Sequence, residues 1–323
     1  MNCLCCGKLI KESNPEEQEY CWHLKCIKSF FGTKELPDIE ISDEIIKALA
    51  DESTNKGITV PGVQKKISLH LSAKKNQKPR LTLINYPSGY ILKPQTEEYP
   101  SLPEAEHLTM RMAEKVGIKT VPYALVKMSE EKLAYITKRI DRIDTQMLAM
   151  EDFCQLDGRL TEDKYKGSYE RCAKIISEFS TQSGLDMTEL FLRIVFSFVV
   201  GNSDMHLKNF SLIETAENSG SYVLSKAYDM LPVNTVNPAD KEQFALTMNG
   251  KKRNLHRGDF LKFADTCGIQ RRVAEKLIDK VTNKKDVLLE ECRNSYLPDE
   301  LKESLIDLIQ TRIDVLKYNS NRR

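Results

Sequence analysis

An aspartate and an asparagine five positions apart, Asp204 and Asn209, stand directly after a strongly apolar segment of the chain. A further carboxylate, Asp229, follows twenty residues after Asn209. Phosphoryl transfer needs a carboxylate beside the attacking hydroxyl and oxygen ligands for Mg²⁺, and these residue types supply both. Asp204 would accept the proton of the hydroxyl, whereas Asn209 and Asp229 would hold the metal ion.

The spacing of Asp204 and Asn209 also has a plainer interpretation. Asp and Asn often cap or turn a chain after a helix, and one Asp-x4-Asn pair arises readily by chance. Two features favour the chemical interpretation: Asp229 ends a predicted hairpin, and Lys93 ends a predicted strand, where its charge can pair with nucleotide phosphates. His206 lies in the same loop, but a structural role is the simpler one, and we assign it no catalytic role.

The segment 57–66 has a composition suited to phosphate binding. It contains Thr59, Gly62, Lys65 and Lys66, and backbone amides beside glycine can grip phosphate oxygens. It matches neither a Walker loop nor the Gly-x-Gly-x-x-Gly of protein kinases. Taken alone, a flexible turn before a strand is the simpler interpretation.

The N-terminal segment has two pairs of soft ligands, Cys3 with Cys6 and His23 with Cys26. Thiolates and imidazole at this spacing suit a tetrahedral, structural Zn²⁺. The alternatives are reduced cysteines near a flexible terminus, or a different choice among the six Cys and His residues of this segment. A closed site with four ligands would stabilise the fold and would not catalyse a reaction.

Composition limits the remaining classes of function. The chain has 323 residues, with 48 basic and 47 acidic side chains and a formal charge of +1. No global field attracts nucleic acid, so direct nucleic-acid binding is not expected. No window approaches the roughly 18 apolar residues of a membrane span, and the N-terminus lacks a signal-peptide pattern, so we expect a cytoplasmic protein with no membrane contact.

The segments before residue 150 predict a small α+β lobe. Helical spacing over 104–116 ends at Gly117, a plausible C-terminal cap. Five segments have strand patterns, namely 67–72, 81–84, 90–93, 124–128 and 133–137.

The segments after residue 150 predict a mostly helical lobe. Residues 169–183 are amphipathic, and 187–200 are apolar nearly all round, as expected of a buried helix. Residues 210–213 and 221–224 predict a hairpin that leads directly into Asp229. These patterns divide the chain into four regions. They are a Cys-rich module over 1–37, an acidic linker over 38–56, a small lobe with the phosphate-binding loop over 57–149, and a helical lobe with the catalytic loop over 150–323.

Six motifs in this order carry a family resemblance: Tyr90-Ile91-Leu92-Lys93-Pro94, Ala105-Glu106-His107, Arg139-Ile140-Asp141-Arg142, Glu151-Asp152-Phe153-Cys154-Gln155, 201–210 and Tyr228-Asp229. The chain resembles the HipA-like serine/threonine kinases of bacterial toxin–antitoxin modules, especially the shorter HipT-type toxins. The resemblance implies a two-lobed, protein-kinase-like fold. It also implies Lys93 as the ATP-phosphate lysine, Asp204 as the catalytic base, and Asn209 and Asp229 as the Mg²⁺ ligands.

The resemblance gives the segment 57–66 a role in ATP binding and autophosphorylation. Family members carry Ser-x-Ser-Gly or a near relative there, and phosphorylation of a loop serine can eject the loop. This chain has Thr59-Val60-Pro61-Gly62, so Thr59 is the hydroxyl that remains. We expect Thr59 to be the only phosphorylation site of the loop, with Lys65 and Lys66 contacting its phosphate or those of ATP.

By resemblance, the function is that of an ATP- and Mg²⁺-dependent toxin kinase. The resemblance implies an essential translation protein as substrate, such as an aminoacyl-tRNA synthetase, and antitoxin partners of HipS or HipB type. The segment before Gly57 is expected to be too short for the extra N-terminal subdomain of full-length HipA. The alternative is a protein of a different class, a catalytically silent binding protein that docks an antitoxin or nucleic acid through the zinc module. The sequence disfavours it because it retains Lys93, Asp204, Asn209 and Asp229. A kinase of a small metabolite is disfavoured by the resemblance alone.

Overall fold

The structure is a computed structural model that describes six ranges of the chain: 1–39, 66–73, 77–82, 89–129, 132–143 and 146–317. The chain divides into two compact units. The N-terminal unit comprises Met1–His107 and Val121–Thr145, and the C-terminal unit comprises Leu108–Thr120 and Gln146–Arg323. Each unit is described by itself below.

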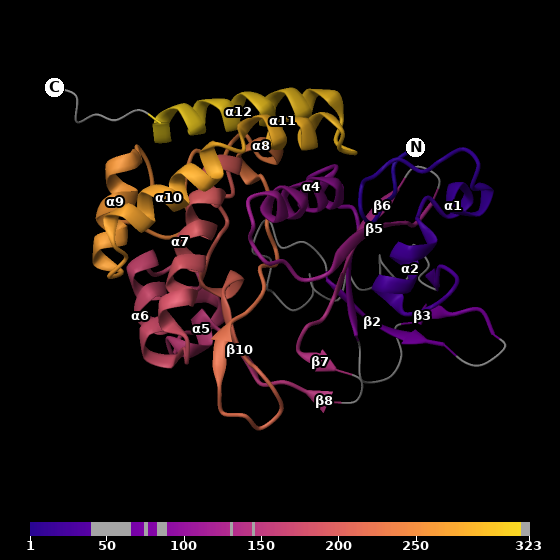
Figure 1. The fold of residues 1–323 in the computed structure, drawn as a ribbon, viewed down its shortest axis with the longest axis horizontal. Coiled ribbons are helices and arrows are strands. Elements are labelled where there is room, and N and C mark those ends of the chain that lie inside the picture. The colour runs from indigo at the N-terminus through magenta and orange to yellow at the C-terminus, as the bar shows by residue number, and fades with distance from the viewer. Residues whose placement is uncertain (40–65, 74–76, 83–88, 130–131, 144–145, 318–323) are drawn as a thin grey trace. The chain divides into compact units, whose positions relative to one another are not determined.

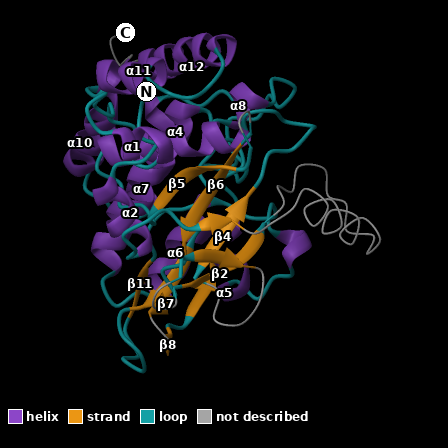
Figure 2. Ribbon diagram, turned by 90° about the vertical axis from the view of Figure 1, so that its right-hand side faces the viewer, coloured by secondary structure: helices purple, strands orange, loops and turns teal. Residues whose placement is uncertain are grey.

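A six-stranded sheet forms the centre of the N-terminal unit, with the strand order β1-β3-β2-β4-β6-β5 (Figures 1 and 2). The short strand β1 pairs with β3 in parallel, and every other pair is antiparallel. The strands are β1 (Asp38–Ile39), β2 (Ile67–Ser72), β3 (Arg80–Thr82), β4 (Tyr90–Lys93), β5 (Tyr123–Lys127) and β6 (Leu133–Lys138). A strand is found at each of the five predicted positions, although residues 83 and 84 of the second lie outside the described residues. The strand β1 was not predicted.

Strand patterns and burial agree in this sheet. Leu69, Leu81 and Leu92 are fully buried, because apolar side chains that alternate along a strand point to one face. The strand β4 lies between β2 and β6, and Lys93 at its end pairs in register with Tyr135. The fixed strand therefore sets the direction of the Lys93 side chain.

Two short helices, α1 (Pro15–Tyr20) and α2 (Leu24–Phe31), precede the sheet and belong to the same compact unit. The helix α4 (Leu102–Lys115) contains the boundary between the two units. It confirms the helix predicted over 104–116. The chain turns at Gly117 with φ +83°, a conformation that glycine adopts without a steric penalty.

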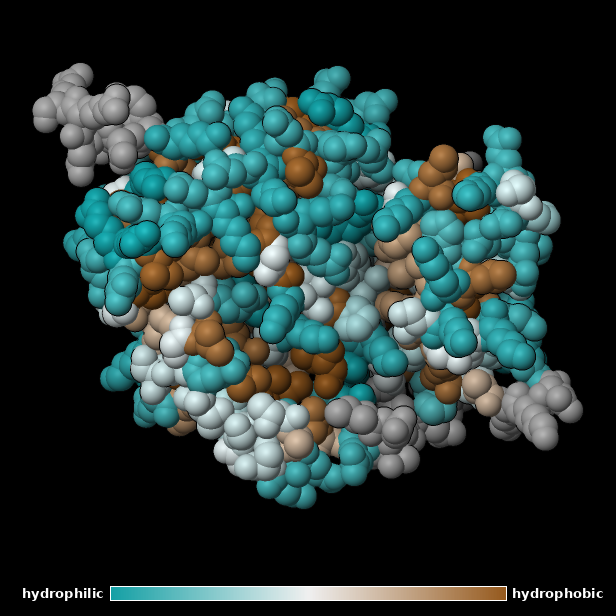
Figure 3. Space-filling view, viewed as in Figure 1, coloured by the Kyte–Doolittle hydropathy of each residue, from teal (hydrophilic) through white to brown (hydrophobic). Residues whose placement is uncertain are grey.

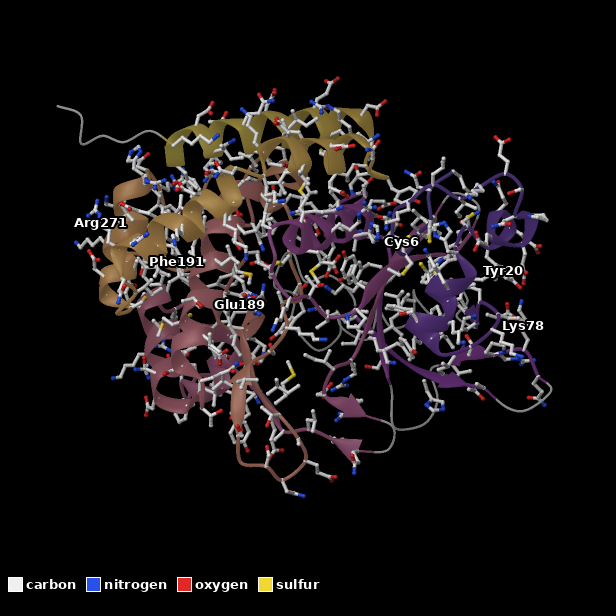
Figure 4. The ribbon with its side chains drawn as sticks, in the orientation of Figure 1. Cys6, Tyr20, Lys78, Glu189, Phe191 and Arg271 are labelled. Carbon is white, nitrogen blue, oxygen red and sulfur yellow. The ribbon has the colours of Figure 1, made fainter. Side chains whose placement is uncertain are left out.

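The C-terminal unit is built around the helix α7 (Ser183–Val200), which contacts α6, α10 and α12 (Figure 1). Phe191 of α7 is fully buried, and Glu189, two positions earlier, binds Arg193 of the next turn; Figure 4 labels both residues on α7. The other helices are α5 (Phe153–Leu156), η1 (Thr161–Asp163), α6 (Tyr169–Phe179), η2 (Leu207–Asn209), α8 (Val233–Val236), α9 (Arg257–Thr266), α10 (Arg271–Thr282), α11 (Lys285–Arg293) and α12 (Asp299–Lys317).

A three-stranded antiparallel sheet, β11-β10-β9, completes this unit. The predicted hairpin is confirmed as β10 (Ser211–Glu214) and β11 (Tyr222–Leu224). The strand β9 (Met150–Asp152) pairs with the other side of β10 and was not predicted. Two short strands, β7 (Arg142–Ile143) and β8 (Gln146–Met147), precede it.

The mixed sheet and the helical C-terminal part confirm the α+β class predicted from the sequence. Among the described residues, no helix is both long and apolar enough to cross a membrane. The outer side chains of α10 and α12 that Figure 3 shows are mostly hydrophilic.

Candidate active site

The loop that carries Asp204 begins where α7 ends. Gly201 caps α7 in the left-handed region, with φ +70°. A Cβ at this position would lie 2.4 Å from Cδ2 of Leu308 and 3.3 Å from the Asn234 side chain. Glycine is therefore required both by the backbone conformation and by the close approach of α12. This residue fixes the direction in which the chain leaves α7.

The structure brings together the three residues predicted from their spacing. Nδ2 of Asn209 donates to the backbone oxygen of Asp204 at 3.1 Å and to that of Asp229 at 3.5 Å. Asn209 is only 2% exposed. Because Nδ2 is bound by two carbonyl groups, Oδ1 is the atom of this amide that can face a cation. The carboxylate of Asp229 supplies the second oxygen donor, so the set suits Mg²⁺.

The Asp229 backbone is held in an uncommon conformation. Its φ is +59°, in the left-handed region that few residues other than glycine adopt. The preceding residue, Tyr228, donates from its hydroxyl to the backbone oxygen of Lys208 at 3.0 Å and lies 2.5 Å from Oγ of Ser211. Burial raises the pKa of Tyr228 well above its usual value, so the hydroxyl stays protonated. These bonds tie Asp229 to the loop and to β10.

A tyrosine that the sequence did not single out contacts the predicted catalytic base. The hydroxyl of Tyr165 donates to Oδ1 of Asp204 at 2.7 Å. Burial and the neighbouring carboxylate of Asp204 raise the pKa of Tyr165, which keeps this hydroxyl a donor. The segment is held to the loop because the amide of Leu207 donates to the oxygen of Lys164 at 3.2 Å. Tyr165 therefore orients the Asp204 side chain.

His206 packs within the loop. Its side chain is buried, its ring lies edge-on to that of Tyr165 at 5.0 Å between centroids, and its amide donates to the Asp204 oxygen at 2.8 Å. These contacts support the structural role that the sequence favoured.

In the N-terminal unit, Lys93 forms a buried ion pair. Its Nζ lies 2.6 Å from Oε1 and 2.8 Å from Oε2 of Glu106. The two side chains are 4% and 0% exposed. Nζ also lies 5.3 Å from the ring centroid of Tyr135, within cation–π range. A lysine held in this way presents a fixed charge, as the lysine–glutamate pair of protein kinases does.

Glu106 lies in a motif noted in the sequence, but its role as the partner of Lys93 was missed. The sequence held only a partial signal, namely that Glu106 shares helical spacing with the small residues Thr109 and Ala113. The structure buries all three fully. A glutamate on a buried face of a helix requires a cationic or hydrogen-bonding partner. The sequence did not show which lysine would provide it.

The predicted phosphate-binding loop comprises residues 57–66. Thr59, Gly62 and Lys65 lie outside the described residues. Lys66 is described and is exposed directly before β2.

The predicted metal ligands of the N-terminal segment lie together. The ligand atoms of Cys3, Cys6, His23 and Cys26 are all within 4.8 Å of one another. Figure 4 labels Cys6, with further sulfur atoms close to it. Hydrogen bonds with Cys26 and Cys3 hold the pKa of Cys6 far below its usual value, so this crowded cluster favours a thiolate. Three thiols and one imidazole match the donor set of a structural zinc site.

The family of the chain follows from comparison with known proteins. The HipA-like C-terminal domain family matches residues 58–287, well over half of the chain. The chain belongs to this family. A Haemophilus influenzae protein named "Putative kinase" is 28% identical over 291 residues, which cover 81% of this chain and 82% of the relative. "Putative kinase Y4dM" of Sinorhizobium fredii is 32% identical over 186 residues, covering 54% of this chain and 44% of the relative.

Two solved structures share the fold of this HipA-like chain. HipA of Shewanella oneidensis MR-1, solved with HipB and its operator DNA, matches with a TM-score of 0.64 at 19% identity. This match covers 79% of the present chain and 63% of HipA, so the chain spans less than two thirds of that protein. The proinflammatory kinase CtkA of Helicobacter pylori matches with a TM-score of 0.52 at 16% identity, covering 77% and 95%. The chain is thus a HipA-like protein related to proteins named as kinases.

Proposed function

We propose that this HipA-like protein is an ATP- and Mg²⁺-dependent serine/threonine protein kinase and the toxin of a bacterial toxin–antitoxin system of the short HipT type. The observation that carries the proposal is the pair of hydrogen bonds from the side-chain amide of Asn209 to the backbone oxygens of Asp204 and Asp229. These two bonds bring the candidate base Asp204 together with the candidate metal ligands Asn209 and Asp229, which follows the β10–β11 hairpin. The buried pair of Lys93 and Glu106 and the family match support the same activity.

Each residue has a defined role in the proposed reaction. The hydroxyl oxygen of a substrate Ser or Thr attacks the γ-phosphorus of ATP, and the bond from that phosphorus to the ADP oxygen breaks. Asp204 accepts the hydroxyl proton, and Tyr165 keeps the Asp204 carboxylate oriented. Lys93 would bind ATP phosphates, and Asn209 and Asp229 would hold Mg²⁺, which would supply positive charge to neutralise the phosphate oxygens.

The substrate, the regulation and the partner are carried by resemblance. We include in the proposal an essential translation protein, such as an aminoacyl-tRNA synthetase, as the substrate. A dianionic phosphate on Thr59 would compete with the ATP phosphates for Lys65, Lys66 and backbone amides such as that of Gly62. The solved HipA structure contains HipB, which supports an antitoxin of HipB or HipS type as partner.

A transfer assay tests the activity. The wild type, Asp204→Ala and the matched control Asp314→Ala are incubated with γ-labelled ATP, Mg²⁺ and a cell lysate. Asp314 is a suitable control because its side chain is 71% exposed on α12. We expect labelled protein bands with the wild type and the control, and none with Asp204→Ala.

Three outcomes would overturn parts of the proposal. Tight ATP binding without transfer by the wild type would contradict a kinase and favour a silent binding protein. Labelling that survives in Asp204→Ala would contradict the role of Asp204 as base. Phosphopeptide mapping of the wild type tests Thr59 separately, and phosphate found only at other residues would exclude autophosphorylation of the loop.

A further inference from the structure

Cys3, Cys6, His23 and Cys26 form a cluster of possible metal ligands that has no role in the proposed phosphoryl transfer. We propose that it binds one Zn²⁺ and that the metal-bound N-terminal segment is a brace that positions the Lys93–Glu106 pair. The metal site stands independently of the kinase proposal, whereas the effect on ATP binding rests on it.

The distances in the cluster suit a tetrahedral zinc ion. With zinc–sulfur bonds of about 2.3 Å and zinc–nitrogen bonds of about 2.0–2.1 Å, neighbouring ligand atoms lie roughly 3.5–3.8 Å apart. All four ligand atoms lie within 4.8 Å of one another, and Sγ of Cys6 is 3.3 Å from Nδ1 of His23. Small shifts of the side chains therefore bring all four atoms onto one ion.

The groups around the ligands are also those of a metal site. Nε2 of His23 lies 3.2 Å from the backbone oxygen of Leu9. Because a carbonyl oxygen only accepts, Nε2 carries the proton, and Nδ1 is then the nitrogen with a lone pair for the metal. The amide of His23 donates to Sγ of Cys3 at 3.3 Å, which fixes the direction of this sulfur atom. Hydrogen bonds of this kind, made by the ligand residues to backbone groups, orient zinc ligands in many proteins.

The turn between Cys3 and Cys6 is closed by its own backbone. The amide of Gly7 donates to the backbone oxygen of Cys3 at 2.7 Å, and the amide of Cys3 donates to the backbone oxygen of Lys8 at 2.8 Å. Gly7 has φ +64°, which glycine adopts without strain. The turn therefore presents the thiols of Cys3 and Cys6 to one point and directs the backbone oxygens of Leu4 and Cys5 elsewhere.

Those two oxygens contact the elements that carry the ion pair. The oxygen of Leu4 accepts from the amide of Leu125 in β5 at 2.9 Å. The oxygen of Cys5 lies 3.3 Å from Nε2 of His107, the residue that directly follows Glu106 in α4. Here too the carbonyl can only accept, so His107 donates. One turn of the metal site thus holds both the edge strand β5 and the helix that carries Glu106.

The second half of the cluster contacts the strand that carries Lys93. Cys26 lies in α2, and the rings of Phe30 and Phe31 at the end of α2 pack against Tyr90, with centroids 5.8 and 5.5 Å away. The hydroxyl of Tyr90 also donates to the oxygen of Phe30 at 3.3 Å. Tyr90 begins β4, and Lys93 ends it. A metal ion bound by Cys6 and Cys26 would therefore connect the segment that contacts α4 with the helix that contacts β4.

Metal analysis tests the site. We expect about one equivalent of zinc per chain in protein purified without chelators, and loss of most of it in Cys3→Ser and Cys26→Ser. Cys5→Ser and Cys21→Ser are matched controls from the same segment and should keep the metal. Substoichiometric zinc in the wild type, or loss in either control with retention in Cys26→Ser, would overturn the ligand assignment.

Hydrogen exchange tests the brace without relying on activity. In His107→Ala the metal should remain, while amides of α4 around Glu106 should exchange about fivefold faster, the factor that corresponds to one lost hydrogen bond. Amides of α7 serve as the internal control. Unchanged exchange in α4, both in His107→Ala and after zinc removal, would overturn the brace.

The kinetic readout links the brace to Lys93. If the kinase proposal holds, His107→Ala should raise the KM for ATP several-fold with a smaller change in kcat. A kinase with an unchanged KM for ATP would refute the link and leave the activity standing. If no phosphotransfer is found at all, the kinase proposal fails, and the zinc and exchange measurements still decide the brace.

Discussion

Replacing Lys93 by methionine should destabilise the N-terminal unit strongly, because it leaves the Glu106 carboxylate buried without its counter-ion. Met has nearly the length of Lys and removes the ammonium group alone. Glu106 then loses the two hydrogen bonds of 2.6 and 2.8 Å from Nζ, at a position with 0% exposure. Removing one partner of a buried pair typically costs about 3–5 kcal/mol of unfolding free energy. That is a large part of the roughly 5–15 kcal/mol that keeps a protein folded.

A double variant separates the cost of the unpaired charge from the cost of repacking the site, both measured as a loss of unfolding free energy. Lys93→Met with Glu106→Leu replaces both charges by apolar groups, which is often neutral for buried ion pairs. We therefore expect the double variant to regain at least about 2 kcal/mol relative to Lys93→Met. Glu106→Leu alone should be destabilised as well, since it leaves the Lys93 ammonium buried.

The chain offers a local probe for this measurement. Trp22 is the only tryptophan, and it is fully buried in the N-terminal unit against Phe30 and Phe31. Urea titrations followed by its fluorescence report unfolding of this unit. The matched control is Lys78→Met, because Lys78 pairs with Asp38 at the surface, where both side chains are about half exposed and the pair contributes little.

The stability of Lys93→Met should depend on pH in a defined direction. In Lys93→Met the folded protein favours protonation of the Glu106 carboxyl more than the unfolded chain does. Its stability should therefore rise relative to the wild type as the pH falls from 8 to 5, and the deficit should shrink. A Lys93→Met variant as stable as the wild type at both pH values, or a double variant less stable than both single variants, would refute the buried ion pair.

Three further predictions concern the C-terminal unit. Gly201→Ala should lower the unfolding free energy by about 1–3 kcal/mol, measured by urea unfolding followed by circular dichroism, because of its positive φ and the 2.4 Å approach of Leu308; equal stability would show that α12 yields freely. Tyr165→Phe removes the 2.7 Å bond that orients the Asp204 carboxylate, so kcat in the transfer assay should fall several-fold with little change in the KM for ATP; an unchanged kcat would contradict this. Asp186→Ala should cost about 2–4 kcal/mol in the same unfolding assay, since this buried carboxylate accepts from Ser180, Gln182 and the Leu224 amide; a loss below 1 kcal/mol would mean that water replaces these bonds.

Local patterns in the sequence were enough to locate β2 to β6, the β10–β11 hairpin and the helices α4, α6 and α7. Alternation of apolar residues located strands such as β2 and β4, and an all-round apolar run located α7. The same patterns explain why β9 and β1 were missed. Each is only two or three residues long, so it has too few positions to show a period, and its partner strand lies far away in the sequence.

The sequence by itself determined the chemistry-bearing residue types: the carboxylates and amide around Asp204, the lysine that ends a strand, and the soft ligands near the N-terminus. Only the tertiary structure decided how they are held. The bond from Tyr165 to Asp204 spans 39 positions, and that from His107 to Cys5 spans 102. Spacing along a chain reports neighbours within one helix or hairpin, whereas contacts over such separations depend on how whole elements pack.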